Sequence, residues 1–163
     1  YKRGLESFAK ASARAGIVGT IVPDCPPEEG AEYVASMKQH GVHPVFIYSP
    51  STSDARMHAL GTAGGGLVYV MARKGVTGLD TQFSGELEAY LARCRAATKL
   101  PLAVGFGLKS KADVDFLVGK ADIAVVGTQS LRLLEEQGID AVAQWLSRLR
   151  EPSARRKEAL HRL

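Results

Sequence analysis

The sequence predicts an α/β fold built on a parallel sheet. Five short apolar segments recur along the 163 residues, and helical patterns separate them. The segments are continuously apolar and rich in β-branched residues, which is typical of strands buried on both faces of a parallel sheet. Strands that alternate with helical patterns indicate successive βα units. The expected strands are residues 19–23, 44–48, 66–71, 102–105 and 123–127.

Residues that favour helix starts and ends support the expected helices. Gly16 follows the first helical pattern and suits a C-terminal cap, because glycine adopts the left-handed backbone conformation at little cost. Pro26 and Pro27 suit the start of the second, where a missing N–H loses no partner. The expected helices are residues 5–15, 27–40, 54–60, 86–97, 111–118, 131–136 and 139–149.

The composition fits one globular domain with a sizeable core, since 45% of the residues are hydrophobic and 23% are charged. No apolar run reaches the roughly 18 residues of a membrane span, and the first residues do not resemble a secretory signal. Cys25 and Cys94 stand alone, without the spacing of a metal or redox site. We expect two packing thiols in a reducing, cytoplasmic compartment, and no metal.

The formal net charge of +4 raises the question of a nucleic-acid partner. The excess gathers near the end of the chain, where the spacing is typical of a helix with one solvated face. That stretch has no aromatic side chain on which a base would stack. We therefore expect no nucleic-acid partner. The basic residues are Arg148, Arg150, Arg155, Arg156, Lys157 and Arg162.

The spacing of the strands indicates one enlarged loop. Their centres lie 22 to 25 residues apart, except between residues 69 and 103, where the interval is 34. The stretch Arg73-Lys-Gly-Val-Thr-Gly78 opens this loop at the carboxyl end of a strand, where such folds place their chemistry. Five βα units suit an open doubly wound sheet or part of a (β/α)8 barrel. A whole barrel takes roughly 250 residues, about 90 more than this chain has.

Two glycine-rich turns favour the barrel. Gly105-Phe106-Gly107 ends the fourth expected strand, and Gly127-Thr128 ends the fifth, shortly before two helices. In barrels, the loops after the last two strands and a short extra helix commonly bind phosphate. Glycine lets the backbone approach the anion, and free N–H groups at a helix start attract it. Either turn alone also fits ordinary turn geometry, but the pair predicts a phosphate site.

A set of motifs runs through the whole chain. They are VPDCPPEE at residues 22–29, PVFIYSPST at 44–52, Tyr69 followed by RKGVTG at 73–78, VGFG at 104–107 and VGT at 126–128. In this order they resemble the α subunit of tryptophan synthase, from about its fourth strand onward. The resemblance implies one (β/α)8 barrel domain, of which residues 1–163 supply about strands 4 to 8. The N-terminal part of that barrel is then expected to be absent from this sequence.

The resemblance also implies an activity and a partner. Members of the family are lyases of tryptophan biosynthesis that split indole-3-glycerol phosphate into indole and glyceraldehyde 3-phosphate. Indole passes to a β subunit within an α2β2 assembly. No cofactor is implied on this chain, because the pyridoxal phosphate of the family's complex belongs to the partner.

Site residues follow from the same resemblance. Ile47 and Phe106 would form walls of the indole pocket. Tyr69 would stand near the catalytic carboxylate, although taken alone it equally suits a core residue with a satisfied hydroxyl. The implied phosphate contacts are Gly78, Gly107, Gly127 and Thr128.

The enlarged loop would be a lid that closes over the substrate and excludes water. Its residues include Arg73, Lys74, Gly75 and Val76, and Thr77 would reach a catalytic aspartate on closure. Lys74 departs from the small hydroxyl residue common at that position. Its ammonium group either assists the phosphate or stays solvated.

The main acid and base of the reaction are missing from this sequence. Cleavage needs an acid and a base of separately tuned acidity, and in the family both lie in the absent N-terminal part. Asp24 follows a strand, but its position before Pro26 suits a turn or a helix cap better. We therefore expect the isolated chain to be inactive. Two alternatives remain: a shortened barrel that binds phosphate or a partner without catalysis, and a sugar-phosphate isomerase, against which GVTG after Tyr69 argues.

Overall fold

The computed structural model describes residues 4–72, 85–105 and 107–151. Its strands are β1 (Gly19–Ile21), β2 (His43–Tyr48), β3 (Val68–Met71), β4 (Leu102–Gly105) and β5 (Ile123–Ala124). Its helices are α1 (Leu5–Arg14), α2 (Ala31–Gln39), α3 (Asp54–Ala63), α4 (Gly85–Ala97), α5 (Lys111–Leu117), α6 (Thr128–Gln137) and α7 (Ile139–Arg150).

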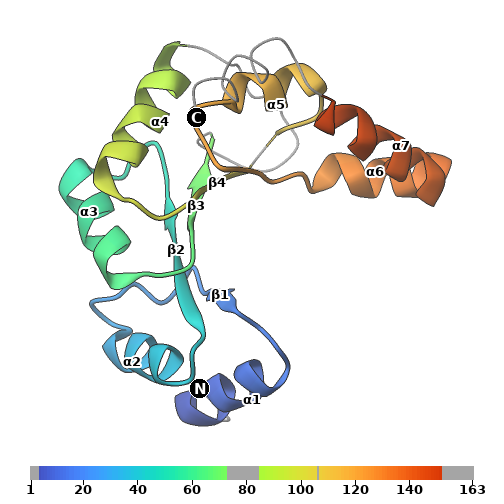
Figure 1. Ribbon diagram of the computed structural model, residues 1–163. Coiled ribbons are helices and arrows are strands. Elements are labelled where there is room, and N and C mark those ends of the chain that lie inside the picture. Colours follow the sequence, from blue (N-terminus) through green and yellow to red (C-terminus); the bar gives the residue numbers. More distant parts are fainter. Residues whose placement is uncertain (1–3, 73–84, 106, 152–163) are drawn as a thin grey trace.

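The five strands form one parallel sheet in chain order, β1-β2-β3-β4-β5. A doubly wound sheet would reverse its order at a switch point and carry helices on both faces. Here the sheet is curved, and α2, α3 and α4 lie along its convex side (Figure 1). Strand order and curvature are those of a (β/α)8 barrel segment, so the barrel prediction is confirmed and the doubly wound alternative is excluded.

The pairing register separates two faces of the sheet. Phe46, Val68 and Leu102 are aligned across three strands and belong to the buried core beneath the helices. The adjacent row of Ile47, Tyr69, Ala103 and Ile123 points to the opposite, concave face, because side chains alternate along a strand. In a complete barrel this face lines the interior.

The main core lies between the sheet and α3, α4 and α5. Tyr48, at the end of β2, is fully buried, and its hydroxyl donates a hydrogen bond to the Met57 carbonyl of α3. Cys94 on α4 belongs to the same core, and burial raises the pKa of its thiol to about 11. The expectation of packing thiols is confirmed for both, because the half-buried Cys25 packs against a second core cluster formed with α1 and α2.

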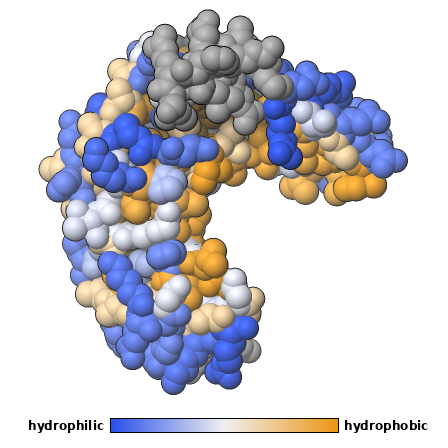
Figure 2. Space-filling model, viewed as in Figure 1, coloured by the Kyte–Doolittle hydropathy of each residue, from blue (hydrophilic) through white to orange (hydrophobic). Residues whose placement is uncertain are grey.

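Burial on both faces proved wrong for the outer strands. Both residues of β5 are exposed, and Ile21 in β1 is 44% exposed. These strands form the two edges of the sheet, where one side has no neighbouring strand among the described residues. Figure 2 shows apolar surface along the hollow of the arc. Large exposed hydrophobic residues elsewhere are Phe8, Ile17, Val18, Leu131, Leu134, Ile139 and Leu146.

Two helix starts differ from the prediction. The second helix begins at Ala31 rather than at Pro27, because Glu29 and Gly30 donate to the Pro26 carbonyl and form a separate turn. The prolines therefore begin a turn, which their fixed φ suits equally well. The helix expected at 131–136 begins earlier, at Thr128, directly after the Gly127 turn.

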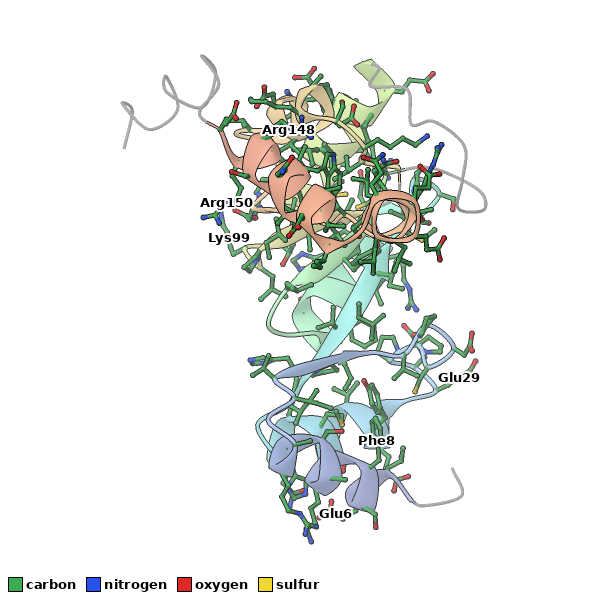
Figure 3. All side chains as sticks on the ribbon, turned by 90° about the vertical axis from the view of Figure 1, so that its right-hand side faces the viewer. Glu6, Phe8, Glu29, Lys99, Arg148 and Arg150 are labelled. Atoms are coloured by element: carbon green, nitrogen blue, oxygen red, sulfur yellow. The ribbon has the colours of Figure 1, made fainter. Side chains whose placement is uncertain are left out.

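The two ends of the molecule are marked in Figure 3 by Glu6 and Phe8 on α1 and by Arg148 and Arg150 on α7. The Glu6 carboxylate accepts hydrogen bonds from His40 Nε2 at 2.8 Å and Ser36 Oγ at 3.2 Å, which joins α1 to the end of α2. Gly16 has a φ of 75° just after α1, as expected of a helix C-terminus. Among the residues described, every helix is too short or too polar to span a lipid bilayer.

Candidate phosphate and substrate site

The two predicted phosphate turns lie at the same end of the sheet, where the strands have their carboxyl ends. β4 and β5 are parallel neighbours, with Ala103 paired to Ile123, and the Val125 amide donates to the Val104 carbonyl at 2.8 Å. The turns that follow them, at Gly107 and Gly127, therefore leave the sheet side by side at its carboxyl end. Had they left at opposite ends, they could not form one site.

Core packing and a helix cap fix the backbone directly after the first turn. Gly107 has a φ of 85°, in the left-handed region that favours glycine. The next residue, Leu108, is 3% exposed and belongs to the main core. Ser110 then begins α5 with a capping box, in which its Oγ accepts from the Asp113 amide and the Asp113 carboxylate accepts from the Ser110 amide.

The second turn is open. Gly127 is the N-cap residue of α6, and no described side chain caps that helix. Gly127 and Thr128 are both exposed, and a Cβ built at Gly127 would meet nothing within 4 Å. The first N–H groups of a helix have no partner within it, and they carry the positive end of the helix dipole. The Ser130 and Leu131 amides donate to the Gly127 carbonyl, so among the described residues the Thr128 and Gln129 amides are the ones left for an anion at the start of α6.

Tyr69 lies on the concave face, next to the first turn. A Cβ built at Gly105 would lie 2.1 Å from the Tyr69 hydroxyl and 2.7 Å from its ring carbon Cζ. Gly105 thus leaves the space that the tyrosine ring occupies at the end of β4. Burial raises the pKa of Tyr69, so its hydroxyl stays protonated at neutral pH. It can act there as a hydrogen-bond donor.

Ile47 shares the row of Tyr69 and also lines a hollow of about 460 Å³ between two loops. One loop follows β1 and contains Cys25 and Pro26, and the other follows β2 and contains Ser49 to Ser53. An ion pair between Glu28 and Arg56 joins the two sides. Asp24, in the first loop, is exposed and is not among the residues that line this hollow.

Several predicted site residues lie outside the described part of the chain. They are Phe106, Thr77, Gly78 and the lid residues Arg73, Lys74, Gly75 and Val76. The structure brings together Tyr69 with the end of β4, and Gly107 with Gly127 and Thr128. Their roles in binding remain predictions. Among the described residues, no group of three or more His, Cys, Asp or Glu side chains is placed to hold a metal ion.

Sequence reasoning missed two residues of this region. Gly105 serves as the space beside Tyr69, and nothing in a single sequence links positions that lie far apart in the chain. Val125 should share the concave face with Ile123, because side chains two apart in a strand point the same way. Residues 123–127 are continuously apolar, so the sequence alone did not show which of their side chains face the interior.

The sheet and its turns define the class of protein: a parallel (β/α)8 barrel, seen here as five consecutive βα units with the glycine turns of its last two strands together. A family profile described as tryptophan synthase alpha chain matches residues 1–161. The chain therefore belongs to the tryptophan synthase alpha chain family.

Individual relatives agree. The chain is 55% identical over 150 residues to the tryptophan synthase alpha chain of Syntrophotalea carbinolica and 50% identical over 149 residues to that of Desulforapulum autotrophicum. These matches cover 92% and 91% of this chain, but only 59% of each relative. The chain thus spans about three fifths of the length of these relatives.

Solved structures give the same fold. Tryptophan synthase of Mycobacterium tuberculosis matches with a TM-score of 0.80 at 30% identity, over 91% of this chain and 56% of that one. A tryptophan synthase α2β2 complex from Pyrococcus furiosus matches with a TM-score of 0.79 at 26% identity, over 93% and 61%.

Proposed function

We propose that this chain contributes the phosphate-binding half of a barrel that cleaves indole-3-glycerol phosphate into indole and glyceraldehyde 3-phosphate, in the cytoplasm. Family membership supports the reaction class. The observation that carries the proposal is that two turns lie together at the carboxyl end of the sheet. They are the Gly107 turn, with its positive φ, and the uncapped start of α6.

The phosphate would bind at these turns. A phosphate group carries up to two negative charges and several acceptor oxygens, which matches exposed amides and the dipole of a ten-residue helix. Thr128 adds a hydroxyl donor. Placing the phosphate there directs the rest of the substrate over the concave face, toward Tyr69 and Ile47.

The chemistry requires proton transfers that this half does not provide. The bond between the indole ring carbon and the glycerol chain breaks. The ring carbon gains a proton, and the hydroxyl of the carbon that becomes the aldehyde loses one. The described row Ile47, Tyr69, Ala103 and Ile123 contains no carboxylate. We therefore propose that the 163 residues are inactive alone and that Tyr69 supports an acid and a base from the rest of the barrel.

A β subunit is the proposed partner. The Pyrococcus furiosus neighbour is an α2β2 complex, and indole released at the carboxyl end of the strands would pass to such a partner. No cofactor is proposed on this chain.

Titration with glycerol 3-phosphate tests the binding site. We expect the amide NMR signals of Gly107, Gly127 and Thr128 to shift together and saturate at one dissociation constant, while that of Gly41, on a distant turn, stays in place. Saturating ligand that moves none of the three signals would overturn the phosphate assignment.

Indole release tests the reaction. The 163 residues should release no indole from indole-3-glycerol phosphate. Addition of a polypeptide equivalent to the unmatched N-terminal part of a relative should restore release. Glyceraldehyde 3-phosphate must appear in equal amount, and consumption of substrate without indole would instead favour the isomerase alternative.

A further inference from the structure

The segment between the first phosphate turn and α5 is held by a residue from a distant helix. The indole Nε1 of Trp145, on α7, donates a hydrogen bond to the Lys109 carbonyl at 3.1 Å. Trp145 is 9% exposed and is the only tryptophan of the chain. Thirty-six positions separate the two residues, so this contact is entirely a product of the fold.

Both backbone polar groups of Lys109 are hydrogen-bonded. Its N–H donates to the Asp113 carboxylate at 2.8 Å, while its carbonyl accepts from Trp145. The preceding residue, Leu108, is anchored in the core. Because Gly107 is the most permissive described residue of the turn, the anchored positions of Leu108 and Lys109 together constrain where the Gly107 and Leu108 amides point.

The same helix leads back to the second turn. α7 follows α6 after Gly138, the two helices pack against each other, and α7 also packs against α5. The N-terminus of α6 is the open turn at Gly127. The Trp145 hydrogen bond therefore joins the first turn to the helical hairpin that carries the second (Figure 1).

We propose that Trp145 is a positioning residue for phosphate binding: its indole N–H fixes the Lys109 carbonyl and thereby sets the Gly107 turn against the start of α6. The inference rests on the proposed phosphate site. Trp145 does not touch the phosphate; it acts through the backbone of residues 107–109.

The test removes the N–H group and keeps the shape of the side chain. Replacement of Trp145 by benzothienylalanine, which has sulfur in place of the indole N–H, preserves the bicyclic ring. Trp145→Phe serves as a second variant that bacteria can express directly. In both we expect glycerol 3-phosphate to bind about fivefold more weakly, as for the loss of one hydrogen bond. Without ligand, the amide NMR signals of Gly107 and Leu108 should shift relative to the parent protein. Those of Gly127 and Thr128 should not.

Leu149→Val is the matched control. Leu149 lies on the buried side of the same helix, at 7% exposure, and its aliphatic side chain has no donor to offer the Lys109 carbonyl. This variant should lose stability through packing but bind the ligand as the parent does. All affinities are measured well below the unfolding transition.

The outcomes separate the two proposals. A parent protein that binds no phosphate overturns the proposed site, and the inference with it. A parent that binds, with both Trp145 variants within twofold of its affinity, overturns only the inference and leaves Trp145 a packing residue. Equal weakening by Leu149→Val also overturns it, because loosening of α7 would then explain the result.

Discussion

The starts of α5 and α6 occupy equivalent places, because each follows a glycine turn at the end of one of two neighbouring parallel strands. They differ in whether a side chain caps the first backbone amides. At α5, Ser110 and Asp113 satisfy the backbone amides, and the Asp113 carboxylate also accepts from Lys109. At α6, Gly127 offers no side chain, and no described group caps the helix. The Ser53 side chain likewise caps α3 by accepting from the Arg56 amide.

Uncapped glycine starts are not confined to α6, because α1, α2 and α7 begin in the same way. What sets α6 apart is its place beside the Gly107 turn, and we propose that this start is left for a ligand. A cap at α6 would stabilise the helix by about 1 kcal/mol in most proteins. The proposed site thus combines a turn held by the contacts of Leu108 and Lys109 with an uncapped start of α6. A phosphate would then complete the cap that the sequence omits.

Replacing Gly105 and Gly127 by alanine should show the contrast between the two turns most strongly. Gly105→Ala places a Cβ 2.1 Å from the Tyr69 hydroxyl, so we expect the free energy of unfolding to fall by about 1–3 kcal/mol in a denaturant titration. Gly127→Ala meets no steric clash, but alanine is a poorer N-cap than glycine, so this change should cost less, about 0.5–1 kcal/mol. Combining Gly105→Ala with Tyr69→Ala should cost less than the sum of the single changes. Additive losses would show that the ring and the glycine do not compete for one space.

Gly127→Asp should convert the open helix start into a capped one. Aspartate is a preferred N-cap residue and its charge suits the helix dipole, so stability should hold or rise by a few tenths of a kcal/mol. Glycerol 3-phosphate should bind at least about tenfold more weakly, because the carboxylate occupies the amides and repels the anion. Gly127→Asn, a cap without the charge, should fall between Asp and the parent. Unchanged affinity in the aspartate variant would contradict a phosphate at α6.

Ser110→Ala should do the reverse at α5. It removes the oxygen that accepts from the Asp113 amide at 3.3 Å, and we expect a loss of about 1 kcal/mol in unfolding free energy. Phosphate affinity should stay within twofold, since the Asp113 carboxylate still holds Lys109. A change in affinity larger than the change in stability would mean that this cap belongs to the site.

Thr128→Val is expected to have the smallest effect. Valine keeps the branched shape of threonine but lacks the hydroxyl donor, and the side chain is exposed, so stability should not change. Affinity for glycerol 3-phosphate should fall about two- to fivefold, as for one hydrogen bond. The same titration measures it, and a stronger loss would show that the hydroxyl, rather than the main chain, dominates binding.

Much of the fold follows from the sequence because strands and helices leave local patterns of apolar residues, glycine and proline. Five apolar segments gave five strands, and the glycine turns and the motif order indicated a barrel rather than a doubly wound sheet. The start of α2 could not be predicted, because Pro26 and Pro27 suit a turn as well as a helix. The exposed faces of β5 depend on which neighbours a strand has, which its own residues do not reveal.

The candidate site was predictable only where its residues belong to short local motifs. Gly107, Gly127 and Thr128 belong to short motifs, whereas Gly105 matters only through Tyr69, a partner 36 positions away. Trp145 lies in the helix expected at residues 139–149, where the pattern does not distinguish it from its apolar neighbours. Its hydrogen bond to Lys109 depends on how α7 packs against α5, and single-sequence patterns do not contain that information.

The chain-order arrangement of the sheet has a consequence for how the molecule assembles. Each new strand joins the edge left by the one before it, so long-range contacts arise mainly between consecutive units, as in repeat proteins. Growth by addition limits each loop closure to one βα unit, but parallel pairing still folds more slowly than pairing of strands joined by a hairpin. It also means that a further unit docking on either border would need no strand already in place to move.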